Sequence, residues 1–324
     1  MRSEQISKLK VAFITGPFPM MGQTFIINQV ADLLERGVDI KVFAYGHGGS
    51  ELISERFSQY HMSIRTYYLH PPKSMFRRVL KSFTLTLWML FLHTRVLFRA
   101  INVFKYHREA WSLRLLFSVA QFCGKDINLV HCHFGDIALQ FLNIREVLGL
   151  RAPLVTTFYG HDVSAMLLRL GDNIYNRLKI EGDLFFVMSE DMKRRVLANG
   201  FSEKKVRVLP VSIDVASYPY RERRFEQGKS VEIVSVGRFV EKKGMDDLIR
   251  ALAIVRSRCR TQFRCSIVGG GGLERSLLQL VKQLDLKDRV YFTGYMKVED
   301  MIRYFGGMHF MVQASKTASD GDME

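Results

Sequence analysis

The sequence predicts an α/β protein made of two doubly wound domains in tandem. Short apolar runs alternate with stretches of helical periodicity, which is typical of a mostly parallel sheet with helices on both faces. A length of 324 residues also favours two domains. Residues 213–230 interrupt the alternation with charged and turn-forming residues, as a linker does. We therefore expect one domain over residues 1–212 and a second over residues 231–324.

Apolar runs and helix-ending glycines define the elements of the first domain. The run Lys10–Thr15 predicts a first strand, and Thr24–Glu35 predicts a helix that Gly37 ends. A second helix, Ile137–Leu148, is closed by Gly149 in the same way. The other expected elements are a helix over Glu190–Ala198 and strands over Asp39–Tyr45, Asn128–His133, Leu154–Phe158, Leu184–Met188 and Val206–Pro210.

The second domain continues the same alternation. Its expected strands are 231–236, 263–268, 289–293 and 308–313, and its expected helices are 245–257, 273–284 and 298–305. Open α/β sheets bind ligands at the carboxyl ends of their strands. The loops that follow strands therefore hold the candidate site residues.

Composition restricts the class of partner. Hydrophobic residues make up 48% and charged residues 24% of the chain, as in ordinary globular proteins, but the net charge is +15. Such a balance favours anionic partners, namely nucleic acid, acidic lipid or phosphorylated substrates. We expect no nucleic-acid binding, because no helix-turn-helix, zinc-finger or RNP-type signature occurs. Four cysteines without a CxxC pair, and an N-terminal apolar run too short for a signal peptide, predict a cytoplasmic protein.

Residues 73–108 indicate contact with a membrane surface. They carry eight basic residues and no acidic one, interleaved with aromatic and aliphatic residues. The apolar centre, Phe83–Leu92, has about half the length needed to span a bilayer. A helix lying in the anionic interface suits this pattern. The alternative is a pair of core-packed helices with a solvated basic face.

The stretch Ser-Val-Gly-Arg-Phe-Val-Glu-Lys-Lys-Gly at 235–244 is the most informative about chemistry. It ends a buried apolar run and turns before the helical pattern resumes after Gly244. The turn places Arg238 and Lys243 at the carboxyl end of a parallel strand. A planar guanidinium and a compact ammonium together suit a diphosphate. A solvated surface turn is the alternative.

Two glycine-containing turns are weaker candidates for anion binding. Gly22 stands just before the helix at Thr24, where N–H groups and the helix dipole can meet an anion, although the turn is not a GxGxxG fingerprint. Gly270 and Gly271 belong to a run of four glycines between an expected strand and an expected helix. Glycines allow a backbone to approach a phosphate closely. A flexible solvent loop would explain them equally well.

Histidines follow two strands of the first domain. Strand alternation puts His131 and His133 on one face and Cys132 on the other, so these three residues do not predict a metal site. His161 and Asp162 follow the strand at Leu154–Phe158 and are placed to face a cleft. A neutral imidazole there can hydrogen-bond a sugar hydroxyl, while the carboxylate can orient it or cap the next helix. A purely structural histidine is the alternative.

Taken together, these stretches resemble glycosyltransferase family 4 over essentially the whole chain. The second half matches that family in VGRFVEKKGMDDLIRAL, IVGGGGLE, DRVYFTGYM and TASDGDME, and the first half in FPMMGQTFIINQV, HCHFGD, TTFYGHDVS and VLPVSIDVASY. The resemblance is closest to bacterial enzymes that build exopolysaccharides of the colanic-acid type. It implies the GT-B architecture of two Rossmann-like domains. It also implies retaining, metal-independent transfer of a hexose from a UDP- or GDP-sugar, with no further cofactor.

The same resemblance assigns roles to individual residues. Arg238 and Lys243 would neutralise the leaving diphosphate, with Gly22 adding backbone amides, and His161 would lie beside the transferred sugar. Glu324 matches the first carboxylate of the family's E-x7-E motif, which contacts donor-sugar hydroxyls. The acceptor would be lipid-linked or a polysaccharide, reached from the inner face of the cytoplasmic membrane.

One departure from the family pattern concerns the end of the sequence. The second carboxylate of the E-x7-E motif does not occur, so we expect a truncated transferase with an incomplete second domain and weak or no turnover. The alternative function is an inactive remnant of the fold that acts at a membrane surface. An epimerase or a phosphorylase of related architecture is not indicated, because the sequence shows neither a catalytic carboxylate pair nor a cofactor lysine.

Overall fold

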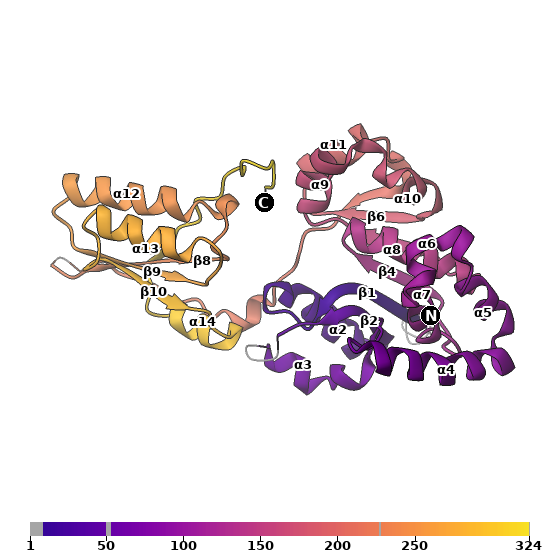
Figure 1. Ribbon diagram of the computed structural model, residues 1–324. Helices are drawn as coiled ribbons and strands as arrows, with labels where there is room; N and C mark the ends of the chain where they lie inside the picture. The colour runs from indigo at the N-terminus through magenta and orange to yellow at the C-terminus, as the bar shows by residue number, and fades with distance from the viewer. Residues whose placement is uncertain (1–8, 50–52, 227, 324) are drawn as a thin grey trace. The chain divides into compact units, whose positions relative to one another are not determined.

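The computed structural model describes residues 9–49, 53–226 and 228–323 (Figure 1). These residues divide into two compact units. The division falls between Val211 and Ser212, except that Ser164–Leu168 groups with the second unit. It lies at the start of the segment in which the sequence predicts a linker.

The first unit is built on a parallel sheet of seven strands in the order β3-β2-β1-β4-β5-β6-β7. The strands are β1 (Lys10–Phe18), β2 (Asp39–His47), β3 (Thr66–Tyr68), β4 (Leu129–His133), β5 (Leu154–Thr157), β6 (Leu184–Val187) and β7 (Val206–Val208). The strand order reverses between β1 and β4, and open α/β sheets bind ligands beside such a reversal.

Helices α2 (Thr24–Glu35), α8 (Gly135–Leu148), α10 (Asn176–Glu181) and α11 (Glu190–Ala198) connect strands of this sheet. Shorter helices are α3 (Glu55–Gln59) and α9 (Ala165–Leu170). The strands β1, β4 and β5 are buried along most of their length, as expected for a sheet covered on both faces. The expected strands and helices of this unit are therefore confirmed, with ends that shift by one to three residues. The three-residue strand β3 has no counterpart in the sequence prediction.

The second unit has a parallel sheet in the order β10-β9-β8-β11. Its strands are β8 (Val231–Val236), β9 (Phe263–Val268), β10 (Val290–Gly294) and β11 (Phe310–Met311), and its helices are α12 (Met245–Arg258), α13 (Glu274–Gln283) and α14 (Val298–Phe305). One apolar cluster joins α12 and α13 to the sheet, with Phe239 and Ile249 fully buried in it. The expected elements are confirmed, although β11 spans two residues and not the six over 308–313 that were expected.

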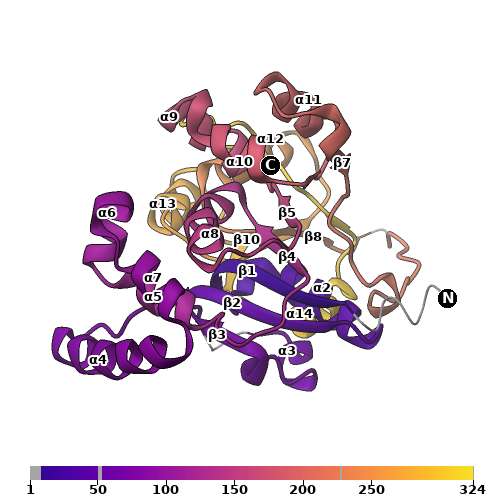
Figure 2. The same cartoon turned by 90° about the vertical axis from the view of Figure 1, so that its right-hand side faces the viewer.

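The basic segment at 73–108 forms α4 (Met75–Leu92), α5 (Thr94–Ala100) and most of α6 (Val103–Trp111), which α7 (Arg114–Ala120) follows. The first two views show α4 on the outside of the first unit (Figures 1 and 2). Within α4 only Met89 is buried. The alternative of core-packed helices is therefore wrong for α4, whereas α7 is buried along most of its length. None of the described helices is long and apolar enough to cross a bilayer.

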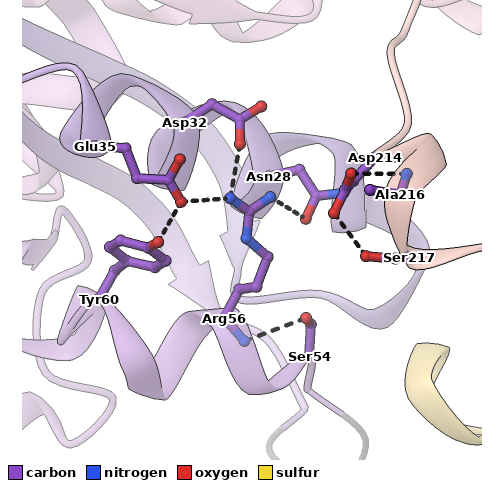
Figure 3. Close-up of polar contacts among 9 residues, drawn as sticks. All are labelled: Asn28, Asp32, Glu35, Ser54, Arg56, Tyr60, Asp214, Ala216 and Ser217. Carbon is purple, nitrogen blue, oxygen red and sulfur yellow. Dashed lines mark hydrogen bonds and ion pairs between the residues drawn. The ribbon is translucent and has the colours of Figure 1, made fainter.

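An arginine fastens α3 to α2 (Figure 3). The Arg56 guanidinium donates to Asp32 at 2.7 Å, to Glu35 at 3.0 Å and to the Asn28 side chain at 3.4 Å. The Arg56 side chain is 24% exposed, so water screens these ion pairs only partly. The network stabilises the connection between β2 and β3, which the sequence did not reveal.

Candidate functional site

An aromatic stack marks the strand-order reversal in the first unit. The rings of His131 and His133 on β4 lie 4.5 Å apart, and Phe13 of β1 packs on both, at 5.1 and 4.9 Å. The two histidines therefore share one face of β4, as strand alternation predicts. Within the described part of the chain, no group of three His, Cys, Asp or Glu residues is arranged to hold a metal ion.

Both histidines of this stack are neutral near pH 7. Burial lowers the pKa of His131 to about 4, and its Nε2 lies 2.7 Å from the Thr157 hydroxyl. The pKa of His133 is also lowered, first by burial and then by the charge that His131 would carry. The His133 Nδ1 pairs with the Tyr159 hydroxyl at 2.8 Å, and its Nε2 is buried without a partner among the described residues. Neutral imidazoles and hydroxyls suit a sugar better than they suit an anion.

Asp162 holds the start of α8 in place. Its carboxylate accepts hydrogen bonds from the backbone N–H groups of Gly135, Tyr159 and Gly160, each at 3.0 Å. Asp162 therefore caps α8, whose first residue, Gly135, lies 27 positions earlier in the chain. Burial raises the pKa of Asp162 to about 6, although the three N–H donors oppose that shift.

Gly135 is a site-forming residue that the sequence did not single out. A Cβ at this position would lie 2.5 Å from a ring carbon of Phe158 and 2.6 Å from the Tyr175 hydroxyl. The Tyr175 hydroxyl donates to the backbone oxygen of Asp162 at 2.7 Å. Only glycine therefore lets α8 begin against the loop that follows β5. The HCHFGD motif contains this glycine, but the side chains that require a glycine here, Phe158 and Tyr175, are distant in the sequence.

The two first-unit residues expected at a ligand lie in exposed positions. His161 begins the short 3-10 helix η3 (His161–Val163), directly before the buried Asp162. Gly22 lies in η1 (Met21–Gln23), and a Cβ there would meet open space. Solvent can reach both, as their expected roles require. No contact of the described residues tests those roles.

A cavity of about 1180 Å³ lies at the carboxyl ends of β1, β2 and β3. The last residues of those strands line one side of it, and α4, α7 and α8 line the other. Its basic lining residues are Lys73, Arg78, Lys81, Arg114, His47 and His70. Among the described residues that line it, none is acidic. The sequence predicted the basic character of α4 but gave no sign of this cavity.

In the second unit the β8 turn carries the two expected phosphate-binding cations. Arg238 is exposed directly after β8. Lys243 ends the 3-10 helix η7 (Glu241–Lys243), and its aliphatic chain lies about 3.3 Å from the position that a Cβ on Gly237 would occupy. Both residues therefore lie at the carboxyl end of β8, as the strand–turn–helix pattern predicts.

The glycine run after β9 packs against that same turn. The Phe239 N–H donates to the Gly270 oxygen at 2.8 Å, and the Tyr295 hydroxyl donates to it at 2.7 Å. A Cβ at Gly269 would lie 2.0 Å from the Gly237 oxygen, and one at Gly271 would lie 2.9 Å from the Phe239 nitrogen. Close contacts explain the glycines at 269, 270 and 271, whereas a Cβ at Gly272 would meet open space. Their contact with a phosphate stays a prediction.

Lys242 was missed, although it lies between two residues of the predicted turn. It is buried, and its ammonium pairs with Asp322 at 3.1 Å. The N–H of Lys316 donates to the Lys242 oxygen at 2.9 Å, and the Ser319 hydroxyl donates to Glu241 at 2.7 Å. The structure thus brings residues 316–322 against η7. Glu324, the expected donor-sugar carboxylate, lies outside the described residues.

Comparison with protein families decides the assignment. The profile described as Glycosyltransferase Family 4 matches residues 22–217, more than half of the chain. The chain belongs to this family. The profile described as Glycosyl transferases group 1 matches residues 219–321, so the two matches meet near the boundary between the two units. The family resemblance in the sequence is therefore confirmed.

Curated relatives match along nearly the whole chain. The amylovoran biosynthesis glycosyltransferase AmsK of Erwinia amylovora is 28% identical over 320 residues, which cover 98% of this chain and 78% of AmsK. The putative colanic acid biosynthesis glycosyltransferase WcaL of Salmonella typhimurium is 26% identical over 319 residues, with the same coverage.

Solved structures confirm the GT-B fold class. The structure of Anabaena HepE in complex with UDP and glucose superposes with a TM-score of 0.63 at 15% identity. It covers 96% of this chain and 75% of HepE. WaaG, a glycosyltransferase involved in lipopolysaccharide biosynthesis, superposes with a TM-score of 0.55 at 15% identity and covers 95% of this chain and 75% of WaaG. At such identities the likeness concerns the fold.

Proposed function

We propose that this protein transfers a hexose from a nucleotide-sugar to a lipid-linked or polysaccharide acceptor during exopolysaccharide synthesis. Family membership over both units carries the proposal, together with relatives whose names place them in colanic acid and amylovoran biosynthesis. The donor is UDP- or GDP-linked, and the reaction retains the anomeric configuration without a metal ion or further cofactor. The enzyme acts from the cytoplasm at the inner face of the membrane.

The second unit binds the nucleotide diphosphate in this proposal. Arg238 and Lys243 at the end of β8 stabilise the charge that develops on the leaving phosphate oxygens. The Gly270 and Gly271 backbone, held against the β8 turn, borders the same site. Gly22 supplies N–H groups at the start of α2. Two fixed cations supply the neutralisation for which other transferases use a metal ion.

The first unit binds the sugar being transferred and the acceptor. His161 hydrogen-bonds the sugar, and the Asp162 carboxylate fixes the backbone before His161 by accepting from the N–H groups of Tyr159 and Gly160. The basic, apolar helix α4 brings the enzyme to anionic lipid. Its exposed hydrophobic residues include Phe76, Leu80, Phe83 and Phe91.

Donor binding is tested by a thermal-shift panel of UDP-, GDP- and ADP-sugars on this chain. We expect stabilisation by at least one of them and its loss in Arg238→Ala/Lys243→Ala. Charge-assisted contacts contribute about 1.5–3 kcal/mol each, so the affinity should fall about 100-fold or more. The matched control is Arg250→Ala/Lys282→Ala, which removes two exposed cations from α12 and α13. Equal losses in both variants would refute the assigned site.

Two further measurements test the stereochemistry of the reaction and the contact with a membrane surface. Proton NMR of the product gives the anomeric configuration, and inversion would contradict the retaining mechanism. Co-sedimentation with liposomes rich in anionic lipid tests the membrane surface. Retained liposome binding in a chain that binds no nucleotide-sugar would favour the alternative of an inactive membrane-surface protein.

A further inference from the structure

The cavity at the ends of β1, β2 and β3 carries a concentration of positive charge that the fold does not explain. Lys73, Arg78, Lys81 and Arg114 line it, and no acidic side chain does among the described lining residues. Like charges that face one cavity repel one another, and the repulsion falls when an anion occupies it. Arg114 also contributes to the lowered pKa of His70, after burial, so its charge is felt inside the cavity wall.

An uncompensated hydrogen-bonding group lies in the same wall. The Tyr45 hydroxyl, near the end of β2, is buried and has no hydrogen-bond partner among the described residues. Buried polar groups in native proteins are normally paired, and an unpaired one calls for a ligand or water.

The cavity is also bordered by a face of α4 that differs from the rest of that helix. Arg78, Lys81, Leu85 and Trp88 line the cavity and recur at helical spacing on one side. Phe76, Leu80 and Phe83 of the same helix are exposed and do not line the cavity. An exposed apolar helix of 18 residues with a single buried residue is unfavourable in water and favourable at a lipid interface.

We propose that this cavity binds the diphosphate group of a lipid-linked acceptor, with the lipid chain following the apolar side of α4. The proposal rests on the proposed function and adds the part of the acceptor that is recognised and the residues that do so. Arg78, Lys81 and Arg114 line the cavity and neutralise the diphosphate. A diphosphate fits better than a carboxylate, because it spreads several negative charges over a cavity lined by four permanent cations.

The test uses the fluorescence of Trp88, which lines the cavity. The chain has two tryptophans, so Trp111→Phe leaves Trp88 as the single reporter. A short-chain prenyl diphosphate is titrated into this background, with inorganic diphosphate and the matching prenyl alcohol as comparisons. We expect the prenyl diphosphate to change Trp88 emission and to bind at least about ten-fold more tightly than either comparison compound.

Two double variants separate the cavity from general surface charge. Arg78→Gln/Lys81→Gln removes two cations that line the cavity, and should weaken binding of the prenyl diphosphate by at least about ten-fold. Arg77→Gln/Arg95→Gln removes two cations of the same basic segment that do not line it, and should change the affinity by less than about two-fold. Circular dichroism verifies that each variant is folded. Equal weakening in both variants would overturn the proposal.

The remaining outcomes are also decisive. If inorganic diphosphate binds as tightly as the prenyl diphosphate, the lipid source of the anion is refuted. If the prenyl alcohol binds as tightly as the prenyl diphosphate, the anion site itself is refuted. The nucleotide-sugar thermal-shift panel is run on Arg78→Gln/Lys81→Gln in parallel. Donor binding that persists while prenyl diphosphate binding is lost separates this site from the donor site. A native chain that binds the prenyl diphosphate but no nucleotide-sugar would refute the proposed function and leave the cavity proposal standing.

Discussion

Acidification should destabilise the first unit through the buried histidines of β4. His131 has an ordinary pKa of 6.5 in the unfolded chain and about 4 in the folded one, because burial disfavours the imidazolium. The unfolded state therefore binds more protons between these values, and stability present above pH 6.5 is lost as the pH falls toward 4. At pH 5.0, 1.5 units below the unfolded pKa, the loss due to His131 alone is about 2 kcal/mol.

Urea unfolding followed by tryptophan fluorescence measures this loss in the relevant unit. Trp88 and Trp111 both belong to the first unit, so their emission reports on its unfolding. His131→Gln keeps a polar group near Thr157 but cannot titrate. The native chain should lose about 2 kcal/mol more than this variant between pH 7.5 and pH 5.0.

The comparison removes the titration of Asp162 from the measured difference. The raised pKa of Asp162 acts in the opposite direction, since that group stabilises the fold at low pH and ceases to do so as the pH rises through 6. Asp162 is present in both chains, so its contribution cancels in the difference. His107→Gln, which removes an exposed imidazole of α6, is the control and should keep the native pH dependence. A native chain and a His131→Gln variant with the same pH dependence would refute the reasoning.

Four substitutions test the packing around three glycines and the ion pairs of Arg56. Gly135→Ala places a methyl group within 2.6 Å of two side chains and should lower the free energy of unfolding of the first unit by about 2–3 kcal/mol, measured by tryptophan fluorescence in urea. Gly244→Ala combines a φ of +60° with a contact of 1.8 Å to a backbone oxygen and should cost at least about 3 kcal/mol by circular dichroism. Gly272→Ala, where the methyl group meets open space, should change stability by less than about 1 kcal/mol. Arg56→Ala should destabilise the first unit by about 1 kcal/mol, and by less in high salt, because the ion pairs are partly exposed.

The strands were predictable because burial on both faces leaves a direct trace in the sequence. Strands such as β1 and β6 contain continuous apolar runs, Val11–Ile14 and Leu184–Val187, and glycines follow α2 and α8. The placement of Arg238 and Lys243 followed from the same rule, since both lie in the turn between β8 and α12. Local pattern therefore located the loops at the carboxyl ends of the strands.

Contacts between distant segments were not predictable from local pattern. Asp162 caps a helix 27 residues earlier in the chain, and the requirement for glycine at position 135 comes from the rings of Phe158 and Tyr175. The adjacent residues Lys242 and Lys243 also differ in burial, which their positions in the sequence do not indicate. Lys242 is buried against Asp322, whereas its neighbour Lys243 is half-buried beside Gly237. Each of these facts depends on which segments the fold brings together.

The first unit separates its polar groups into two chemically different sets. Around the junction of β1, β4 and β5 the groups are neutral, because burial lowers the pKa of His131 and of His133. Each of these imidazoles is hydrogen-bonded to a hydroxyl group. At the ends of β1, β2 and β3 the groups are cationic and solvent-accessible through a cavity. Both sets lie at the carboxyl edge of one sheet and share β1. An acceptor that joins an uncharged sugar to a diphosphate has the same order of neutral and charged parts. If the cavity instead bound a ligand without an anionic group, this correspondence would have no physical basis, and the cations of α4 would be explained by the membrane surface alone.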